Sequence, residues 1–176
     1  MFKFLLYEPI NEVGVQVLRA AGEVRIASST DEDTIIKEIG DIDGAILRAR
    51  GALTRRILEH APKLKVAGRH GTGVDNIDIA AATEFGVQIV NTPEATTEAV
   101  AEHTVGLMVA LSKKIVYADA NTRAGRWNVR YSIEGREMCG RTVGVVGFGR
   151  IGRRVAQICH HGFGMNVLYY DVVAAP

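Results

Sequence analysis

A glycine-rich turn near residue 150 has the residue types and spacing of a phosphate-binding loop. Gly147, Gly149 and Gly152 follow the apolar segment TVGVVG (142–147), and a helix with one apolar face is expected directly after them. In such a loop the first glycine permits a sharp turn, the second lets a diphosphate approach the backbone, and the third lets the helix pack closely on the strand. Because main-chain N–H groups at the helix start would face the phosphates, the spacing predicts a dinucleotide site.

A carboxylate stands where a dinucleotide site needs one. Asp171 ends a second expected strand, NVLYYD (166–171), 19 residues beyond Gly152. A carboxylate there can accept both ribose hydroxyls of an adenosine and would repel a 2′-phosphate, so the pattern favours NAD over NADP. The alternative is a glycine turn that only packs helix on strand, with Asp171 capping the strand end.

A second glycine loop, AGRHGTGVDNID (67–78), leaves the carboxyl end of another expected strand, which is where ligands bind in open parallel sheets. Gly71 and Gly73 would free the backbone to present N–H groups to an anion. Arg69 adds a positive fork suited to carboxylate or phosphate. Since Arg48 ends a further expected strand, it should lie near the same rim. The residues therefore predict a small-anion site.

The same loop also has a purely structural interpretation. It could be a tight turn in which Asp75 and Asn76 cap the next helix, and we expect Asp75 and Asp78 to act as caps.

The histidines and cysteines indicate no catalytic or metal centre. Glu102 and His103 resemble an acid–base pair, but adjacent residues of a helix point in different directions. His70 lies in the anion loop and could contact a ligand, although a surface position is the simpler interpretation. The others are expected at helix surfaces or ends, or as reduced thiols, without metal-ligand spacing: His60, His160, His161, Cys139 and Cys159.

Strands and helices are expected to alternate through the first half of the chain. Short apolar runs predict strands at 3–8, 23–27, 45–49, 64–69 and 87–91. Three helices are expected to begin near residue 11, at a Thr30–Asp33 capping box and at Thr54, the first with Val13, Val17 and Leu18 on its buried face. Strands separated by helices predict a parallel sheet covered on both faces.

Residues 97–121 predict a long helix. Thr96 or Thr97 can cap it, and apolar residues recur at helical spacing over about 25 residues, or roughly 37 Å. Because this is longer than one small domain needs, we place a domain boundary near Pro93. A loop is expected over 122–141, with the single tryptophan, Trp127.

The composition fits a globular protein and excludes two classes of partner. The 21 Lys and Arg residues nearly balance the 20 Asp and Glu residues, so nucleic acid is not an expected ligand. There is no apolar run of about 18 residues and no signal-peptide pattern, so we expect no membrane partner and a cytoplasmic location.

These motifs together resemble the NAD-dependent D-2-hydroxyacid dehydrogenase family, and within it the phosphoglycerate dehydrogenase branch. The resemblance covers nearly the whole chain and is carried in order by RHGTGVDNID, NTPEATTEAVAEHTVGLMVAL, GRTVGVVGFGRIGRRVA and FGMNVLYYD. It implies an α/β fold: a flavodoxin-like, parallel-sheet substrate domain (1–96), followed by an incomplete Rossmann dinucleotide-binding domain (97–176). It also implies a homodimer formed through helix 97–121.

The resemblance assigns roles to individual residues. For the cofactor NAD these are Thr72, Gly147, Gly149, Arg150, Ile151, Gly152 and Asp171. For a small anionic 2-hydroxy or 2-oxo acid they are Arg48, Arg69, Gly73 and Val74. Two arginines favour a substrate with a second anionic group, such as phosphate.

The family's catalytic arginine, glutamate and histidine would lie beyond Pro176, so we expect no catalytic residue in this chain and a fragment that is itself inactive. The corresponding parent would be an NAD-dependent oxidoreductase of the CH–OH group of a 3-phosphoglycerate-like D-2-hydroxy acid. Two alternatives stay open: a non-catalytic module that binds NAD or an anion, and a corepressor-type relative.

Overall fold

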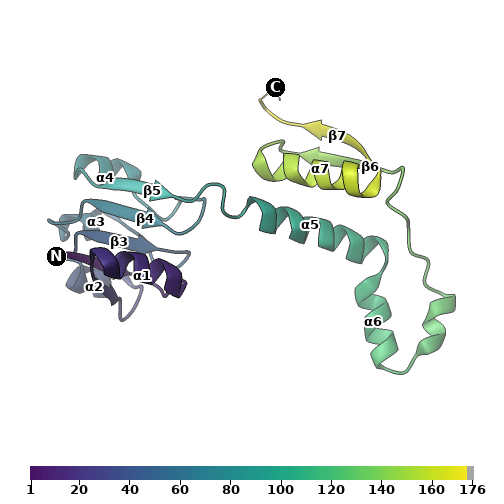
Figure 1. The fold of residues 1–176 in the computed structure, drawn as a ribbon, viewed down its shortest axis with the longest axis horizontal. Coiled ribbons are helices and arrows are strands. Elements are labelled where there is room, and N and C mark those ends of the chain that lie inside the picture. The colour runs from purple at the N-terminus through teal and green to yellow at the C-terminus, as the bar shows by residue number, and fades with distance from the viewer. Residues whose placement is uncertain (174–176) are drawn as a thin grey trace. The chain divides into compact units, whose positions relative to one another are not determined.

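The computed structural model describes residues 1–173 and divides into two compact units between Ala95 and Thr96. The first unit holds a five-stranded parallel sheet in the order β2-β1-β3-β4-β5 (Figure 1). Its strands are β1 (Phe2–Leu6), β2 (Gly22–Ile26), β3 (Gly44–Leu47), β4 (Val66–Arg69) and β5 (Gln88–Asn91). This is the flavodoxin-like strand order, which confirms the expected fold class of this unit.

Four helices cover this sheet: α1 (Glu12–Ala21), α2 (Glu32–Glu38), α3 (Arg55–Glu59) and α4 (Ile79–Glu84). The helices α2, α3 and α4 share one buried apolar cluster with the sheet, and α1 crosses the opposite face (Figure 1). Because β3 and β4 pair in parallel, their carboxyl ends, which lead into the loops of Arg48 and Arg69, lie at the same edge of the sheet.

Helix starts in this unit follow the capping residues with two corrections. Thr54 caps α3 by accepting from the Ile57 N–H, as predicted. The N-cap of α2 is Asp31 instead of Thr30, because its carboxylate accepts from both the N–H (3.0 Å) and the hydroxyl (2.9 Å) of Thr34. Asp78 caps α4 by accepting from the Ala81 N–H, as predicted, whereas Asp75 does not cap this helix.

The buried face of α1 also differs from the prediction. Val15 is buried, whereas Val13 and Val17 are 72% and 68% exposed. Helical spacing alone did not tell which of two apolar stripes faces the sheet.

The second unit contains α5 (Thr97–Ser112), α6 (Ile115–Arg123), the 3₁₀ turn η1 (Trp127–Tyr131), β6 (Thr142–Val146), α7 (Arg150–Phe163) and β7 (Asn166–Tyr170). The strands β6 and β7 pair in parallel, and α7 lies between this pair and α5 (Figure 1). Buried side chains of α5, of α7 and of the loops before β6 and β7 form one cluster, against which Val143 of β6 packs: Ala101, Val105, Met138, Val155, Cys159 and Met165. This strand–helix–strand arrangement presents the glycine turn at the start of α7.

The helix predicted over 97–121 is wrong as a single element, because α5 ends at Ser112 and α6 begins at Ile115. Lys114 between them has a left-handed backbone, with φ 53°. The carbonyl of Ser112 accepts from the N–H of Arg136 (2.8 Å), a residue that returns from the loop after η1. This contact satisfies a carbonyl that a continuing helix would have used itself.

None of the helices within residues 1–173 has the length and apolar character that crossing a membrane requires.

Candidate functional site

The three glycines of the turn after β6 are required for different reasons. Gly147 has φ 90°, a conformation that favours glycine. A Cβ added at Gly152 would lie 2.1 Å from the carbonyl oxygen of Gly147, so close helix–strand packing requires glycine there, as predicted. Gly149 has φ −74°, and a Cβ there would meet nothing within 4 Å. Neither backbone strain nor packing therefore explains Gly149.

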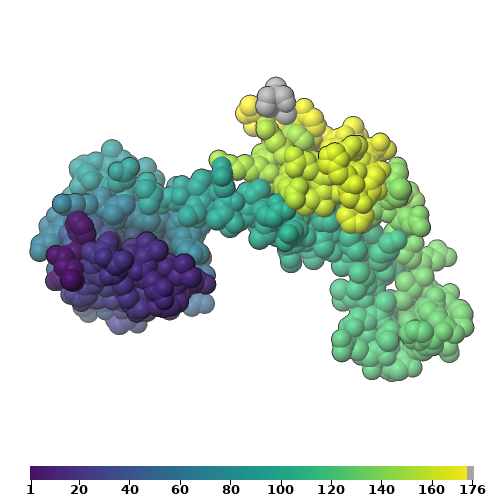
Figure 2. Space-filling view, viewed as in Figure 1, coloured from purple at the N-terminus to yellow at the C-terminus, as the bar shows by residue number. Residues whose placement is uncertain are grey.

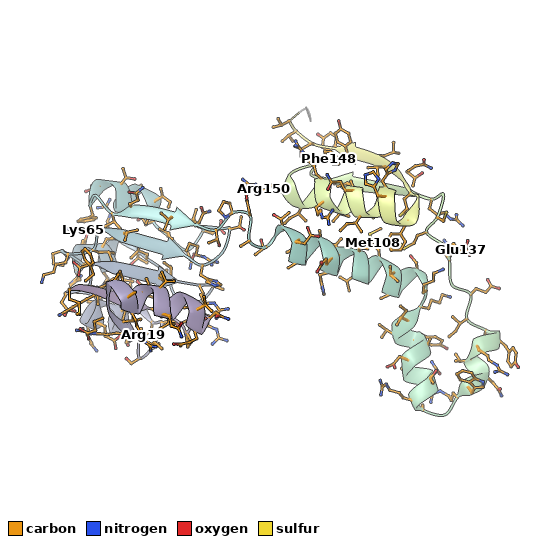
Figure 3. All side chains as sticks on the ribbon, in the orientation of Figure 1. Arg19, Lys65, Met108, Glu137, Phe148 and Arg150 are labelled. Atoms are coloured by element: carbon orange, nitrogen blue, oxygen red, sulfur yellow. The ribbon has the colours of Figure 1, made fainter. Side chains whose placement is uncertain are left out.

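The start of α7 has no side-chain cap among the described residues. Gly149 is its N-cap residue. Arg150 and Ile151 form the first turn, next to Phe148 in the loop (Figure 3). The first N–H groups of a helix have no intrahelical acceptor and carry the positive end of its dipole. An anionic group is the partner that such a helix start prefers.

Asp171 faces this loop. Its Oδ2 accepts from the N–H of Phe148 (2.5 Å), and its Oδ1 accepts from the N–H of Val173 (3.1 Å). These backbone hydrogen bonds, with that of Val173 first, hold the pKa of the Asp171 carboxyl below its ordinary value. The carboxylate therefore stays charged beside the glycine turn at neutral pH.

One aromatic and one cationic side chain contact Phe148 in this loop. The Phe148 ring stacks on Tyr169 of β7 with centroids 4.1 Å apart, and Arg153 donates from Nε to the Phe148 carbonyl (2.9 Å). The sequence did not indicate this partner for Tyr169. Because Phe148 occupies the variable position between two glycines, the motif carried no signal for this stack.

In the first unit, Arg48 directly follows β3 and Arg69 ends the neighbouring strand β4. Leu47, the residue before Arg48, pairs with Arg69 in the register of β3 and β4. Arg48 donates from Nη1 to the Pro9 carbonyl (3.1 Å). Arg69 donates from Nε to Asn76 Oδ1 (3.2 Å) and from Nη1 to the His70 carbonyl. The topology therefore brings both predicted arginines to one edge of the sheet.

Gly71 supports this arrangement in a way that the sequence did not indicate. Its φ is 148°, and an added Cβ would lie 2.5 Å from Arg69 Nη1. Its own N–H donates to the Arg69 carbonyl (2.8 Å). The expectation that Gly71 presents a free N–H to an anion is thus wrong, since the glycine makes room for the Arg69 guanidinium.

The following residues of the loop are held by β5. Asn91 donates from Nδ2 to the Thr72 carbonyl (2.7 Å), and the Thr92 N–H donates to the Gly71 carbonyl (3.0 Å). Val74 packs against the core of the unit, while Gly73 and Thr72 are exposed. The loop is therefore anchored at both ends and open between them.

Comparisons with known proteins agree with this fold. The family model described as "D-isomer specific 2-hydroxyacid dehydrogenase, catalytic domain" matches residues 4–167. The chain therefore belongs to this family of α/β dehydrogenases, as its motifs predicted. A D-3-phosphoglycerate dehydrogenase of Methanocaldococcus jannaschii is 42% identical over 171 residues, which are 97% of this chain and 32% of that protein. The predicted resemblance to the phosphoglycerate dehydrogenase branch is confirmed.

Two solved relatives have NAD in their structures. D-lactate dehydrogenase from Aquifex aeolicus, complexed with NAD and lactic acid, has a TM-score of 0.84 at 28% identity and covers 98% of this chain and 52% of its own. NAD-dependent formate dehydrogenase from Staphylococcus aureus, in complex with NAD, has a TM-score of 0.80 at 28% identity, covering 98% and 57%. This chain spans about a third of the length of the curated relative and about half that of the solved ones.

Proposed function

We propose that this chain supplies the dinucleotide loop and the substrate rim of an NAD-dependent oxidoreductase acting on the CH–OH group of a D-2-hydroxy acid. We further propose that residues 1–96 form the substrate domain and residues 97–176 the cofactor domain. Family membership and the relatives with bound NAD support the cofactor.

One observation carries the cofactor proposal: Gly149 is a glycine that the protein itself does not need. Its backbone is accessible to any residue, and a Cβ would meet no protein atom within 4 Å. A ligand that must touch the backbone, as a diphosphate does, therefore has room at Gly149. The turn therefore fits NAD, held by Gly147, Gly149, Arg150, Ile151 and Gly152, with Thr72 as a further phosphate contact.

Asp171 is proposed to hold the adenosine ribose. Its charged carboxylate beside the loop suits two hydroxyl donors and would repel the 2′-phosphate of NADP. NAD supplies the hydride chemistry when bound, and the residues of this chain bind and orient it. We assign proton transfer to none of them.

The substrate is proposed to be a 2-hydroxy or 2-oxo acid with a second anionic group, like 3-phosphoglycerate. Arg69 donates twice among the described residues, which leaves three of its five guanidinium N–H donors for a ligand. Arg48 lies beside it at the strand ends, and the exposed Gly73 and its neighbour Val74 provide main-chain groups for a carboxylate.

We also propose a cytoplasmic homodimer formed through α5 and α6. Both described cysteines are free, which suits a reducing compartment. Apolar side chains of these two helices line a cavity of about 370 Å³: the exposed Leu107, Leu111, Val116 and Tyr117 and the half-buried Ala110. A second copy of this chain would cover them.

The cofactor role is tested by calorimetric titration of the 176-residue chain with NADH and NADPH. Asp171→Ala should weaken NADH binding about tenfold or more, because a charged hydrogen bond contributes about 1.5–3 kcal/mol. NADPH binding should change less, so that discrimination falls. Asp119→Ala, which removes a surface ion pair with Arg123, is the control. An unchanged NADH-to-NADPH ratio in Asp171→Ala would contradict the ribose role.

The substrate role is tested with D-3-phosphoglycerate. Arg69→Ala should raise its dissociation constant about tenfold or more, again from a lost charged hydrogen bond. Arg19→Ala, on the outer surface of α1, should leave it unchanged, as Arg19 pairs with Glu12 away from the rim. Equal affinities of Arg69→Ala and the unaltered chain would refute the substrate site.

A further inference from the structure

The Asn76 side chain joins the two loops that carry the proposed substrate arginines. Its Nδ2 donates to the carbonyls of Arg48 (3.1 Å) and Gly51 (2.9 Å), both in the loop after β3. Its Oδ1 accepts from Nε of Arg69 (3.2 Å), at the end of β4. One half-buried amide therefore contacts the backbone of one arginine and the guanidinium of the other.

The backbone around Asn76 makes the same connection. The Asn76 carbonyl accepts from the Leu53 N–H (2.9 Å), and Leu53 forms an isolated parallel bridge with Ile77. The loop after β3 is thus fixed to the loop after β4 by backbone contacts as well as by the Asn76 side chain. A third loop joins them, because the Arg48 guanidinium donates to Pro9, which follows β1.

Only an amide side chain provides all three contacts at this position. A carboxylate accepts but does not donate, and an apolar side chain does neither. The Nε–H of Arg69 is fixed by Oδ1 of Asn76. Because Gly71 has no Cβ, which would lie 2.5 Å from Arg69 Nη1, the guanidinium is not displaced from this position. The remaining N–H donors of Arg69 then keep one direction before any ligand binds.

We propose that Asn76 is a positioning residue that holds Arg48 and Arg69 as one preformed site for an acid with two anionic groups. The inference rests on the proposed substrate site and adds the residue that sets its geometry. A preformed pair of cations binds more tightly than a mobile pair because less side-chain entropy is lost on binding.

The chain contains a matched control in its second unit. Asn121 also donates from Nδ2 to a carbonyl, that of Tyr117 (2.8 Å), and accepts from an arginine Nε, that of Arg126 (2.7 Å). It has the same chemistry as Asn76 but belongs to α6. A loss of affinity that follows only from general destabilisation would appear in both variants.

The first experiment measures D-3-phosphoglycerate affinity of the 176-residue chain by calorimetry. Asn76→Leu should bind about tenfold more weakly, whereas Asn121→Leu should stay within about twofold of the unaltered chain. If Asn76→Leu stays within about twofold while Arg69→Ala loses affinity, the inference fails and the substrate site stands. If Arg69→Ala also binds normally, the substrate site fails and the inference with it.

The second experiment uses Asn76→Asp and NMR without any ligand. The carboxylate still accepts from Arg69, so the Nε–H signal of Arg69, assigned with Arg69→Lys, should remain protected from solvent exchange. The carboxylate of Asn76→Asp cannot donate to the carbonyls of Arg48 and Gly51, so those two hydrogen bonds are lost. The amide signals of Ala49 and Ala52, which follow those carbonyls, should therefore shift. Loss of the Arg69 protection, or unshifted amides, would overturn the proposed tether.

Discussion

The Tyr7 side chain departs from the usual rule that buried polar groups form hydrogen bonds. It lies just after β1, is only 2% exposed and belongs to the core of the first unit. Among the described residues its hydroxyl is the buried side-chain atom that has no hydrogen-bond partner. Burial raises the pKa of Tyr7 above its ordinary value, so the group is a neutral phenol at physiological pH.

Tyr7→Phe should therefore stabilise the chain. Leaving a buried hydroxyl without a partner costs about 1–3 kcal/mol, and phenylalanine keeps the ring while removing that cost. Chemical denaturation measures the change in the free energy of unfolding. Tyr170→Phe, with a side chain that is 65% exposed, should leave this free energy nearly unchanged. A destabilised Tyr7→Phe variant would mean that the hydroxyl is bonded.

At the scale of elements, the junction of α5 and α6 is the clearest case of a tertiary contact overriding a helical pattern. The apolar period continues through Ile115 and Val116, yet Lys114 adopts a left-handed backbone. At this junction the Ser112 carbonyl accepts from the N–H of Arg136. At the other end of α5, Glu98 forms an ion pair with Arg154 of α7 (2.6 Å). The side-chain hydrogen bond from Arg154 lowers the pKa of Glu98.

Lys114→Gly should stabilise the chain by about 1 kcal/mol, because a left-handed backbone costs a non-glycine residue about 1–2 kcal/mol. The adjacent Lys113 has a right-handed backbone, with φ −93°. Lys113→Gly should therefore destabilise by about 0.5–1 kcal/mol, since glycine loses more entropy on folding. Thermal unfolding of both variants checks the opposite signs, and equal signs would contradict this explanation of the junction.

At the scale of the whole molecule, the exposed apolar surface of α5 and α6 is the surface through which we propose that the chain self-associates. Figure 2 shows the teal and green segment of α5 and α6 at the surface of the second unit. In this segment Leu111 is 81% exposed and Val116 is 74% exposed. The net charge of +1 offers little repulsion between copies. Both observations favour self-association through this surface.

Leu111→Asp should weaken the proposed homodimer at least about tenfold, because the interface would have to bury an unpaired charge. Sedimentation equilibrium of the 176-residue chain measures the dissociation constant. Val13→Asp, at an exposed valine of α1, is the control for a charge added to an apolar surface residue. A dimer unchanged by Leu111→Asp would place the interface elsewhere, and a monomeric unaltered chain would refute the dimer.

The local features of this protein, such as its helix caps and glycine turns, are determined by its sequence. Thr54 and Asp78 cap their helices because a cap bonds within three residues, and Gly147 and Gly152 are required by one turn and one helix start. Alternation of strands and helices predicts parallel sheets for a similar reason, since each element buries its own apolar face. The family motifs also predict which residues form the site, and those roles stay a prediction.

Contacts between distant segments were decided only by the tertiary structure. The sequence indicated Asn76 as a possible helix cap. In the structure its side chain instead joins two loops, and it donates to the carbonyl of Arg48, which lies 28 residues earlier in the chain. Gly71 makes room for a guanidinium, and Phe148 stacks on Tyr169 of the next strand. Such contacts depend on which strands become neighbours, and they leave no periodic pattern along the chain.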